Sequence, residues 1–241
     1  MRTLLLTLIA STLLFGIDAD EIIKKMNNNL ESDSGYSKIA MYMKTKRNER
    51  KMVMESWNEG TEKSFIKILY PKRDNGITFL KLDNAMWQYV PRIDKTIKIP
   101  SSMMMSSFMG SDFTNDDMAK ESSVVDDYTK KITKEDDKHY YIELLPKEDA
   151  AVVWGKIEIK ILKSNYVPLE ASYYDEDMVK QRELLYEDLK PFGKRIYPTK
   201  WILKSMDKPD NLTTIIMEEV DFGAKLNKAM FTKRGLKRYS K

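Results

Sequence analysis

Apolar and polar residues alternate with a period of two through most of this chain, and short runs of turn-forming residues separate the alternating stretches. In the clearest stretch, Ile157, Ile159 and Ile161 alternate with charged residues. Successive side chains of a β-strand point to opposite faces of its sheet, so this pattern predicts strands with one apolar and one solvated face. A chain of this kind folds into a sheet that must bury one face.

The number and order of these stretches restrict the topology. We count roughly ten or eleven strands between residues 36 and 220, with turn residues at 58–60, 71–76 and 207–211. No helical pattern alternates with the strands, which argues against a parallel sheet and favours hairpin connections. An open sheet this wide must curl, and its concave face then needs a cover. The sequence therefore predicts a mainly antiparallel β (α+β) fold, a curved and incomplete β-barrel.

Two short helices are predicted near the ends of the chain. Residues 20–30 place apolar side chains at helical spacing, and two acidic residues lie in the first turn, where the helix dipole favours them. Residues 227–231 predict a short terminal helix. The last nine residues, 233–241, are basic, and we expect a solvated tail there, with contact to anionic lipid headgroups or an inner-membrane partner as the alternative.

A methionine-rich segment lies between Pro100 and Gly110, and it predicts a helix with Ser101 or Ser102 as its N-cap. The apolar face of this helix would consist of Met103, Met104, Met105, Phe108 and Met109. A methionine face is ordinarily core packing, but flexible thioether side chains also suit a surface that accepts cargo of irregular shape.

A second start signal follows Gly110. Thr114 and Asp117 have the spacing of a capping box, with aspartate in place of Glu or Gln, so a short helix is predicted near Thr114. We expect the two helices, hinged at Gly110, to form a lid over the concave face.

The sequence resembles the outer-membrane lipoprotein-sorting protein family, the LolA-like periplasmic proteins. The resemblance lies in residues 76–80, 86–91, 108–113 and 116–118, and the tract from Trp87 to Asp117 is its specific part. It implies an incomplete barrel, lidded by helices, whose concave face holds acyl chains. The tract itself and a long charged second half depart from the best-known lipoprotein chaperones, so the cargo does not transfer from them.

We expect a set of residues in this tract to touch or gate the cargo. They are Trp87, Tyr89, Met103, Met104, Phe108, Met109 and Phe113. The neighbouring Gly110, Ser111 and Asp112 are predicted to form the lid hinge.

The first 19 residues have the features of a secretory signal peptide. Arg2 precedes an apolar run over residues 4–15, and Ile17-Asp18-Ala19 predicts cleavage after Ala19. Residues 20–241 would then form a single LolA-like domain in the periplasm. The chain has no cysteine, which excludes disulfides and thiolate chemistry. Its formal net charge of +4 does not suggest a nucleic-acid partner.

Residues that suggest catalysis or metal binding are few. His139 is the only histidine and lies in a charged turn, and no Gly-x-Ser-x-Gly motif supports a triad built on it. Asp112, Asp116 and Asp117 lack the spacing of a calcium loop. Methionine thioethers are soft copper ligands, but no cysteine accompanies them and the histidine is distant in sequence. We expect no metal and no cofactor.

The leading hypothesis is a monomeric periplasmic carrier that shields the acyl chains of a lipid or an acylated lipoprotein, with an inner-membrane transporter or exporter as a possible partner. Two alternatives stay open. One is a lipid-sensing or accessory module for a membrane exporter or signalling protein. The other is a hydrolase that would depend on His139 or Ser111.

Overall fold

The computed structural model describes residues 17–83, 85–119, 123–150 and 152–241. The apolar run of the predicted signal peptide lies outside these residues. Within them the chain forms one antiparallel sheet of 13 strands. In chain order these are β1 (Ser34–Lys44), β2 (Glu49–Glu59), β3 (Lys63–Tyr70), β4 (Thr78–Leu82), β5 (Ala85–Val90), β6 (Lys95–Ile99), β7 (Tyr128–Glu135), β8 (His139–Pro146), β9 (Lys156–Leu162), β10 (Pro168–Tyr174), β11 (Lys180–Phe192), β12 (Arg195–Ser205) and β13 (Leu212–Phe222).

The expected ten or eleven strands are an undercount. The expected strand at the segment of β4 is confirmed, and its residues Thr78, Phe79, Leu80 and Lys81 are all buried. This strand is therefore covered on both faces of the sheet.

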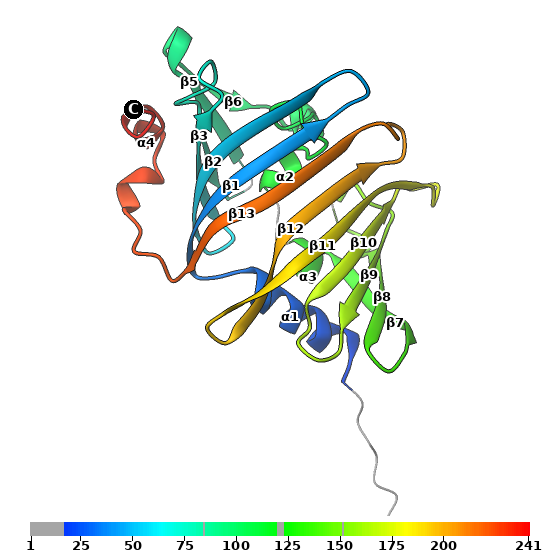
Figure 1. Cartoon of the computed structure of the whole chain (residues 1–241). Helices are drawn as coiled ribbons and strands as arrows, with labels where there is room; N and C mark the ends of the chain where they lie inside the picture. Colours follow the sequence, from blue (N-terminus) through cyan, green and yellow to red (C-terminus); the bar gives the residue numbers. More distant parts are fainter. Residues whose placement is uncertain (1–16, 84, 120–122, 151) are drawn as a thin grey trace, which may run out of the picture.

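The strand order places the first and last strands side by side at the centre of the sheet. From edge to edge it is β6-β5-β4-β3-β2-β1-β13-β12-β11-β10-β9-β8-β7. Each half is therefore a meander of hairpins, and residues 100–127 connect one edge strand to the other. The described residues of this connection, 100–119 and 123–127, lie with α1 on the concave side of the curved sheet, and we call them the cover segment (Figure 1).

The helix α1 (Ala19–Leu30) confirms the predicted N-terminal helix. Its buried residues Ile22, Ile23 and Met26 face the sheet. Asp18, the N-cap, accepts a hydrogen bond from the backbone N–H of Glu21 at 2.7 Å. At the other end, Arg195 of β12 donates to the carbonyls of Asn28 and Glu31, which satisfies acceptors that a helix end leaves open.

The predicted methionine helix is wrong. A single 3-10 turn, η2 (Ser101–Met103), follows Pro100, and the chain then forms turns. Positive φ angles at Met109 and Gly110 are incompatible with a helix that continues through them. The backbone N–H of Phe108 instead donates to the Phe113 carbonyl at 2.7 Å, which closes a tight loop.

The second predicted helix is confirmed as α2 (Asn115–Ala119). Its capping box is reciprocal: the Thr114 N–H donates to the Asp117 carboxylate at 2.7 Å, and the Asp117 N–H donates to Thr114 Oγ1 at 3.0 Å. The cover segment ends with α3 (Ser123–Asp126). None of the helices in the described residues has the length and hydrophobicity needed to span a membrane.

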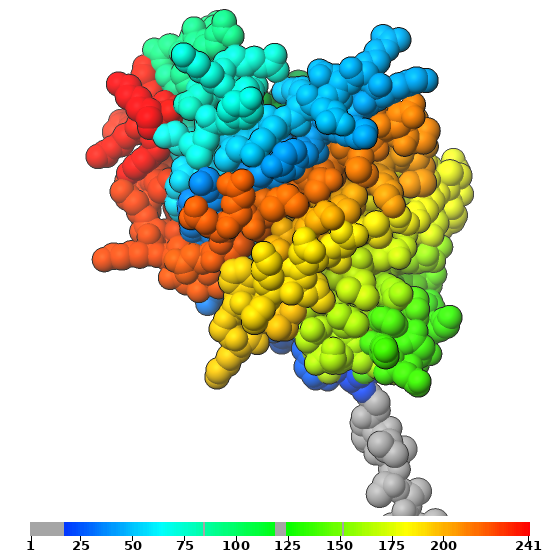
Figure 2. Space-filling view, in the orientation of Figure 1, coloured from blue at the N-terminus to red at the C-terminus, as the bar shows by residue number. Residues whose placement is uncertain are grey.

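The C-terminal residues are packed against the protein, so the expected solvated tail is wrong. The turn η3 (Lys228–Met230) falls within the predicted terminal helix, and α4 (Lys233–Arg238) follows it. Figure 2 shows these residues (red) against the residues of the first half of the sheet. They cover a second apolar cluster on the convex face, formed by Phe65, Leu80, Tyr89, Met230, Phe231 and Leu236.

Candidate functional site

Two adjoining cavities lie between the sheet, α1 and the cover segment, and each has a volume of about 160 Å³. The first lies over the second half of the sheet, and its wall includes apolar side chains from β9 to β12 such as Ile157, Ile159, Ala171, Leu184 and Trp201. The second lies nearer the centre, and its wall includes Ile39, Ile66, Tyr197, Ile215 and Met217. Both belong to the concave face.

The two cavities share part of their walls. The shared residues are Leu30, Glu31, Phe113, Asp117 and Trp201. Asp117 of α2 therefore stands at the partition, and its carboxylate accepts two hydrogen bonds from Arg182 of β11. The Nη1–Oδ2 distance is 2.7 Å and the Nη2–Oδ1 distance is 2.6 Å. This bidentate ion pair links the cover segment to the sheet.

Arg182 lies in the wall of the first cavity and is 7% exposed. Its guanidinium carbon lies 4.5 Å from the ring centre of Trp154 and 4.4 Å from that of Tyr173, so both rings contact the cation. Burial alone would lower the pKa of Arg182, but the hydrogen bonds and charge of Asp117 outweigh it and raise the pKa. Its Nε–H is buried and has no hydrogen-bond partner within the protein.

The residues predicted to touch cargo are divided between the two faces of the sheet. Phe113 lines both cavities. Phe108 is fully buried against Phe79, with 4.8 Å between the ring centres. Met104 and Met109 are partly buried against the same core, whereas the side chain of Met103 is 50% exposed.

Trp87 and Tyr89 are placed on the convex face, away from the cavities, which corrects their expected position. They pack in the apolar cluster beneath the C-terminal residues. The Tyr89 hydroxyl donates to Asp94 at 2.8 Å, and the Trp87 ring lies beneath the Lys98 and Lys233 ammonium groups. The strand period explains the difference: Met86, on the other face of β5, points into the main core.

The predicted hinge residues form a closely bonded loop. Ser111 is buried, and its hydroxyl donates to the carbonyls of Phe108 and Phe113. Asp112 accepts a hydrogen bond from the Thr213 hydroxyl at 2.6 Å, and its backbone N–H donates to the same oxygen at 3.0 Å. Thr213 belongs to the central strand β13, so these bonds fix the loop to the middle of the sheet.

The candidates for catalysis and metal binding lie apart from the cavities or have other partners. His139, at the start of β8, contacts the Asp136 carboxylate at 3.0 Å through Nδ1. Asp112 and Asp117 bond to Thr213 and Arg182 as described above. Within the described ranges, no three His, Cys, Asp or Glu side chains gather in a way that could hold a metal ion.

Sequence reasoning missed the cavity residues of the second half of the sheet. Arg182 and Leu184 lie at a spacing of two in β11, so the period that predicts the strand also places the arginine on the apolar face. A charged residue at an inward position is the signal that was available. Trp154 and Trp201 gave no comparable signal, because a partly buried tryptophan is ordinary in any sheet protein.

A family model with the description "Uncharacterized protein" matches residues 60–238. The chain belongs to this family. No curated protein sequence matches the chain.

Three solved structures share the fold of this chain over about nine tenths of its length. A DUF1329 family protein from Desulfovibrio piger has a TM-score of 0.82 at 20% identity, covering 90% of this chain and 97% of its own. A putative outer membrane lipoprotein-sorting protein domain from Vibrio parahaemolyticus has a TM-score of 0.79 at 19% identity, covering 91% and 98%. A LolA superfamily protein from Nitrosomonas europaea has a TM-score of 0.76 at 20% identity, covering 91% and 99%. The expected LolA-like fold is confirmed.

Proposed function

We propose that this protein is a periplasmic carrier that holds the acyl chains of a lipid or an acylated lipoprotein in the two cavities of the concave face. The observation that carries the proposal is the pair of adjoining cavities, the first of them mainly apolar, between a curved sheet and a cover segment that the Asp117–Arg182 ion pair links to the sheet. The similar protein from Vibrio parahaemolyticus is described as a lipoprotein-sorting domain, which supports this kind of cargo.

We propose that the cover segment moves, because the cavities are small for an acyl chain. Each cavity, at about 160 Å³, is smaller than the roughly 300–1,000 Å³ of typical ligand sites. Asp117 and Phe113 lie in the shared wall, so separating Asp117 from Arg182 would lift α2 and join the two spaces. We propose that the described conformation is the closed, unloaded state and that the ion pair is its latch.

Burial supplies the affinity for an acyl chain. Each methylene withdrawn from water contributes about 0.8 kcal/mol, so a chain that is only partly inserted still binds. The Nε–H of Arg182 is buried without a hydrogen-bond partner, and movement of the cover segment would let it donate to the carbonyl oxygen of an ester or amide at the head of the chain. Glu31, Asp116 and Asp117 lie in the same wall and disfavour an anionic head at this position.

Carriage of this kind needs no catalytic group and no cofactor, and we propose none. We propose that the mature chain is a monomer formed by residues 20–241 after cleavage of the signal peptide. Release requires a membrane partner that binds the open state more tightly than the closed one, because a partner without this preference would not shift the equilibrium.

The four tryptophans provide a direct test. Trp154 and Trp201 line the first cavity, whereas Trp57 and Trp87 lie in the convex cluster. A brominated fatty acid quenches tryptophan fluorescence on contact. We expect saturable quenching in the Trp57→Phe/Trp87→Phe variant, which keeps only the cavity tryptophans, and none in the Trp154→Phe/Trp201→Phe variant.

Equal quenching of the two double variants would mean that the fatty acid adsorbs without entering the cavities. Absence of quenching in the Trp57→Phe/Trp87→Phe variant, with that protein folded by circular dichroism, would contradict acyl binding. The two variants carry the same chemical change, so each serves as the control for the other.

A further inference from the structure

The C-terminal residues carry an unusual concentration of positive charge. Residues 224–241 contain seven Lys and Arg residues and no Asp or Glu, although the whole chain has a formal net charge of only +4. The seven side chains are Lys225, Lys228, Lys233, Arg234, Lys237, Arg238 and Lys241, and all are exposed. The proposed carrier function uses none of them.

These charges are held on a fixed platform. Leu236, on the inner side of α4, is fully buried in the convex cluster, and its carbonyl accepts a hydrogen bond from Thr78 of β4 at 2.8 Å. Thr232 caps the helix by accepting from the Gly235 N–H at 3.0 Å. Because the apolar side of α4 is anchored, its four cations lie on the exposed side of the helix.

The adjoining strands extend the same charged surface. Lys98 of β6 and Lys233 of α4 lie 5.9 Å and 4.8 Å from the centre of the Trp87 ring. Lys237 forms an ion pair with Asp94 at 2.6 Å, and Asp94 directly follows the 3-10 turn η1 (Pro91–Ile93). Ile93 in that turn is 56% exposed. We call the surface the basic face, formed by Arg92, Lys98, Lys233, Arg234, Lys237, Arg238 and Lys241.

We infer that the basic face docks the protein on a bilayer that contains anionic lipids. Its cations are long, flexible and exposed, as suits a surface of mobile phosphate headgroups. An exposed isoleucine beside them can enter the headgroup region. Alternate side chains of β3 and β4 point to opposite faces of the sheet. One set packs in the convex cluster beneath the basic face, and the other packs in the main core on the side of the cavities. Docking through the basic face therefore leaves the cavity face clear of the bilayer.

The test is flotation of the full mature protein with vesicles at low ionic strength. One set contains phosphatidylglycerol and phosphatidylcholine in equal amounts, and the other contains phosphatidylcholine alone. We expect binding to the anionic vesicles only. The Arg234→Gln/Arg238→Gln variant should bind about 30-fold more weakly, because each Lys or Arg near an anionic surface contributes about 1 kcal/mol.

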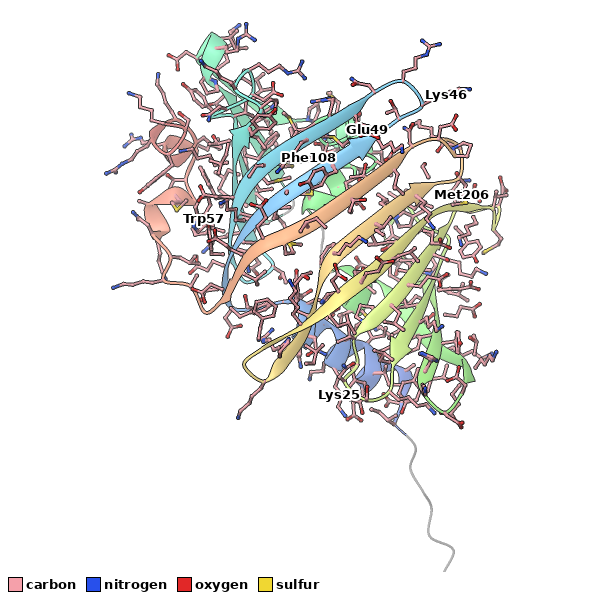
Figure 3. The ribbon with its side chains drawn as sticks, in the orientation of Figure 1. Lys25, Lys46, Glu49, Trp57, Phe108 and Met206 are labelled. Carbon is pink, nitrogen blue, oxygen red and sulfur yellow. The ribbon has the colours of Figure 1, made fainter. Side chains whose placement is uncertain are left out.

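The matched control is Lys46→Gln/Arg47→Gln, which removes the same charge at the tip of the β1–β2 hairpin, where Lys46 lies far from α4 (Figure 3). This variant should bind like the wild type. Equal binding to both kinds of vesicle, equal losses in the two variants, or no binding to anionic vesicles would overturn the proposal, and the last result would direct attention to an acidic protein partner. The outcome does not depend on whether the cavities hold an acyl chain.

Discussion

Asp117 and Arg182, 65 residues apart in the sequence, form a bidentate ion pair between the cover segment and the sheet, with both N–O distances at or below 2.7 Å. The same carboxylate caps α2 through the Thr114 N–H. The Asp117 side chain therefore both caps α2 and attaches it to β11 of the sheet. The pair also lies at the partition between the two cavities, so its rupture is the step that the proposed loading requires.

The first prediction concerns this pair. Asp117→Asn leaves the Arg182 guanidinium buried without an anion, and we expect the free energy of unfolding to fall by about 3–5 kcal/mol. Arg182→Met should also destabilise, but the double variant should lose less than the sum, with a coupling energy of about 1–3 kcal/mol. Denaturant unfolding of the wild type, the two single variants and the double variant measures this coupling energy.

Thr114→Ala is the control, because it removes half of the capping box and leaves Arg182 untouched. We expect it to cost about 1 kcal/mol and to bind no more of a hydrophobic dye than the wild type. Asp117→Asn should bind more dye, since α2 is released from the sheet. Strictly additive losses in the double variant would contradict the latch.

The second prediction concerns the anchoring of the C-terminus. Leu236 is fully buried, and Leu236→Ala should lower the free energy of unfolding by about 2–5 kcal/mol. Leu145→Ala, at an exposed position in β8, should change it by less than about 0.5 kcal/mol. Similar small effects for both would mean that residues 224–241 are a loose tail after all.

The third prediction concerns Gly76, which lies against the C-terminus. Its φ is +80°, and a Cβ atom there would lie 2.6 Å from the Ser240 carbonyl oxygen. Gly60 has a φ of +58° with no atom within 4 Å of such a Cβ. Gly60→Ala should cost about 1–2 kcal/mol for the backbone conformation, and Gly76→Ala about 1–3 kcal/mol more. Equal costs in thermal unfolding would show that the C-terminus yields to the added methyl group.

The fourth prediction concerns alkaline stability. Burial, together with the hydrogen bond to Glu55, raises the pKa of Tyr36 to about 12, and burial with the bond to Glu158 does the same for Tyr174. In the unfolded chain the pKa of tyrosine is about 10. The unfolded chain therefore releases these protons first, so stability is fully present below about pH 10 and is lost as the pH rises towards 12.

The free energy of unfolding, measured across this pH range with tyrosinate absorbance as a second probe, tests whether stability falls as the pH rises. The Tyr36→Phe/Tyr174→Phe variant should lose stability less steeply than the wild type. A wild-type stability that stays constant through the window would contradict the assignment, as would an equal slope in the variant.

The sequence predicts the sheet better than it predicts the site, and particular elements show why. Strands such as β9 are recognisable because Ile157, Ile159 and Ile161 sit at a fixed spacing, and α2 because its capping box is local. The shape of the methionine segment depends on contacts that are distant in sequence, such as the Asp112–Thr213 bond. Similarly, α4 is ordered by its contacts with β4 to β6, which the basic composition of residues 233–241 does not reveal.

The measurement that tests the central claim most directly is native mass spectrometry, with lipid extraction, of the protein purified without detergent. Val153→Asp, at a 40% exposed position, puts a charge in the wall of the first cavity, and Val179→Asp makes the same change at a 56% exposed position that lines neither cavity. The account predicts a near-stoichiometric acyl species on the wild type and Val179→Asp, and its loss from Val153→Asp. A wild-type protein that stays unloaded after incubation with membranes would contradict it.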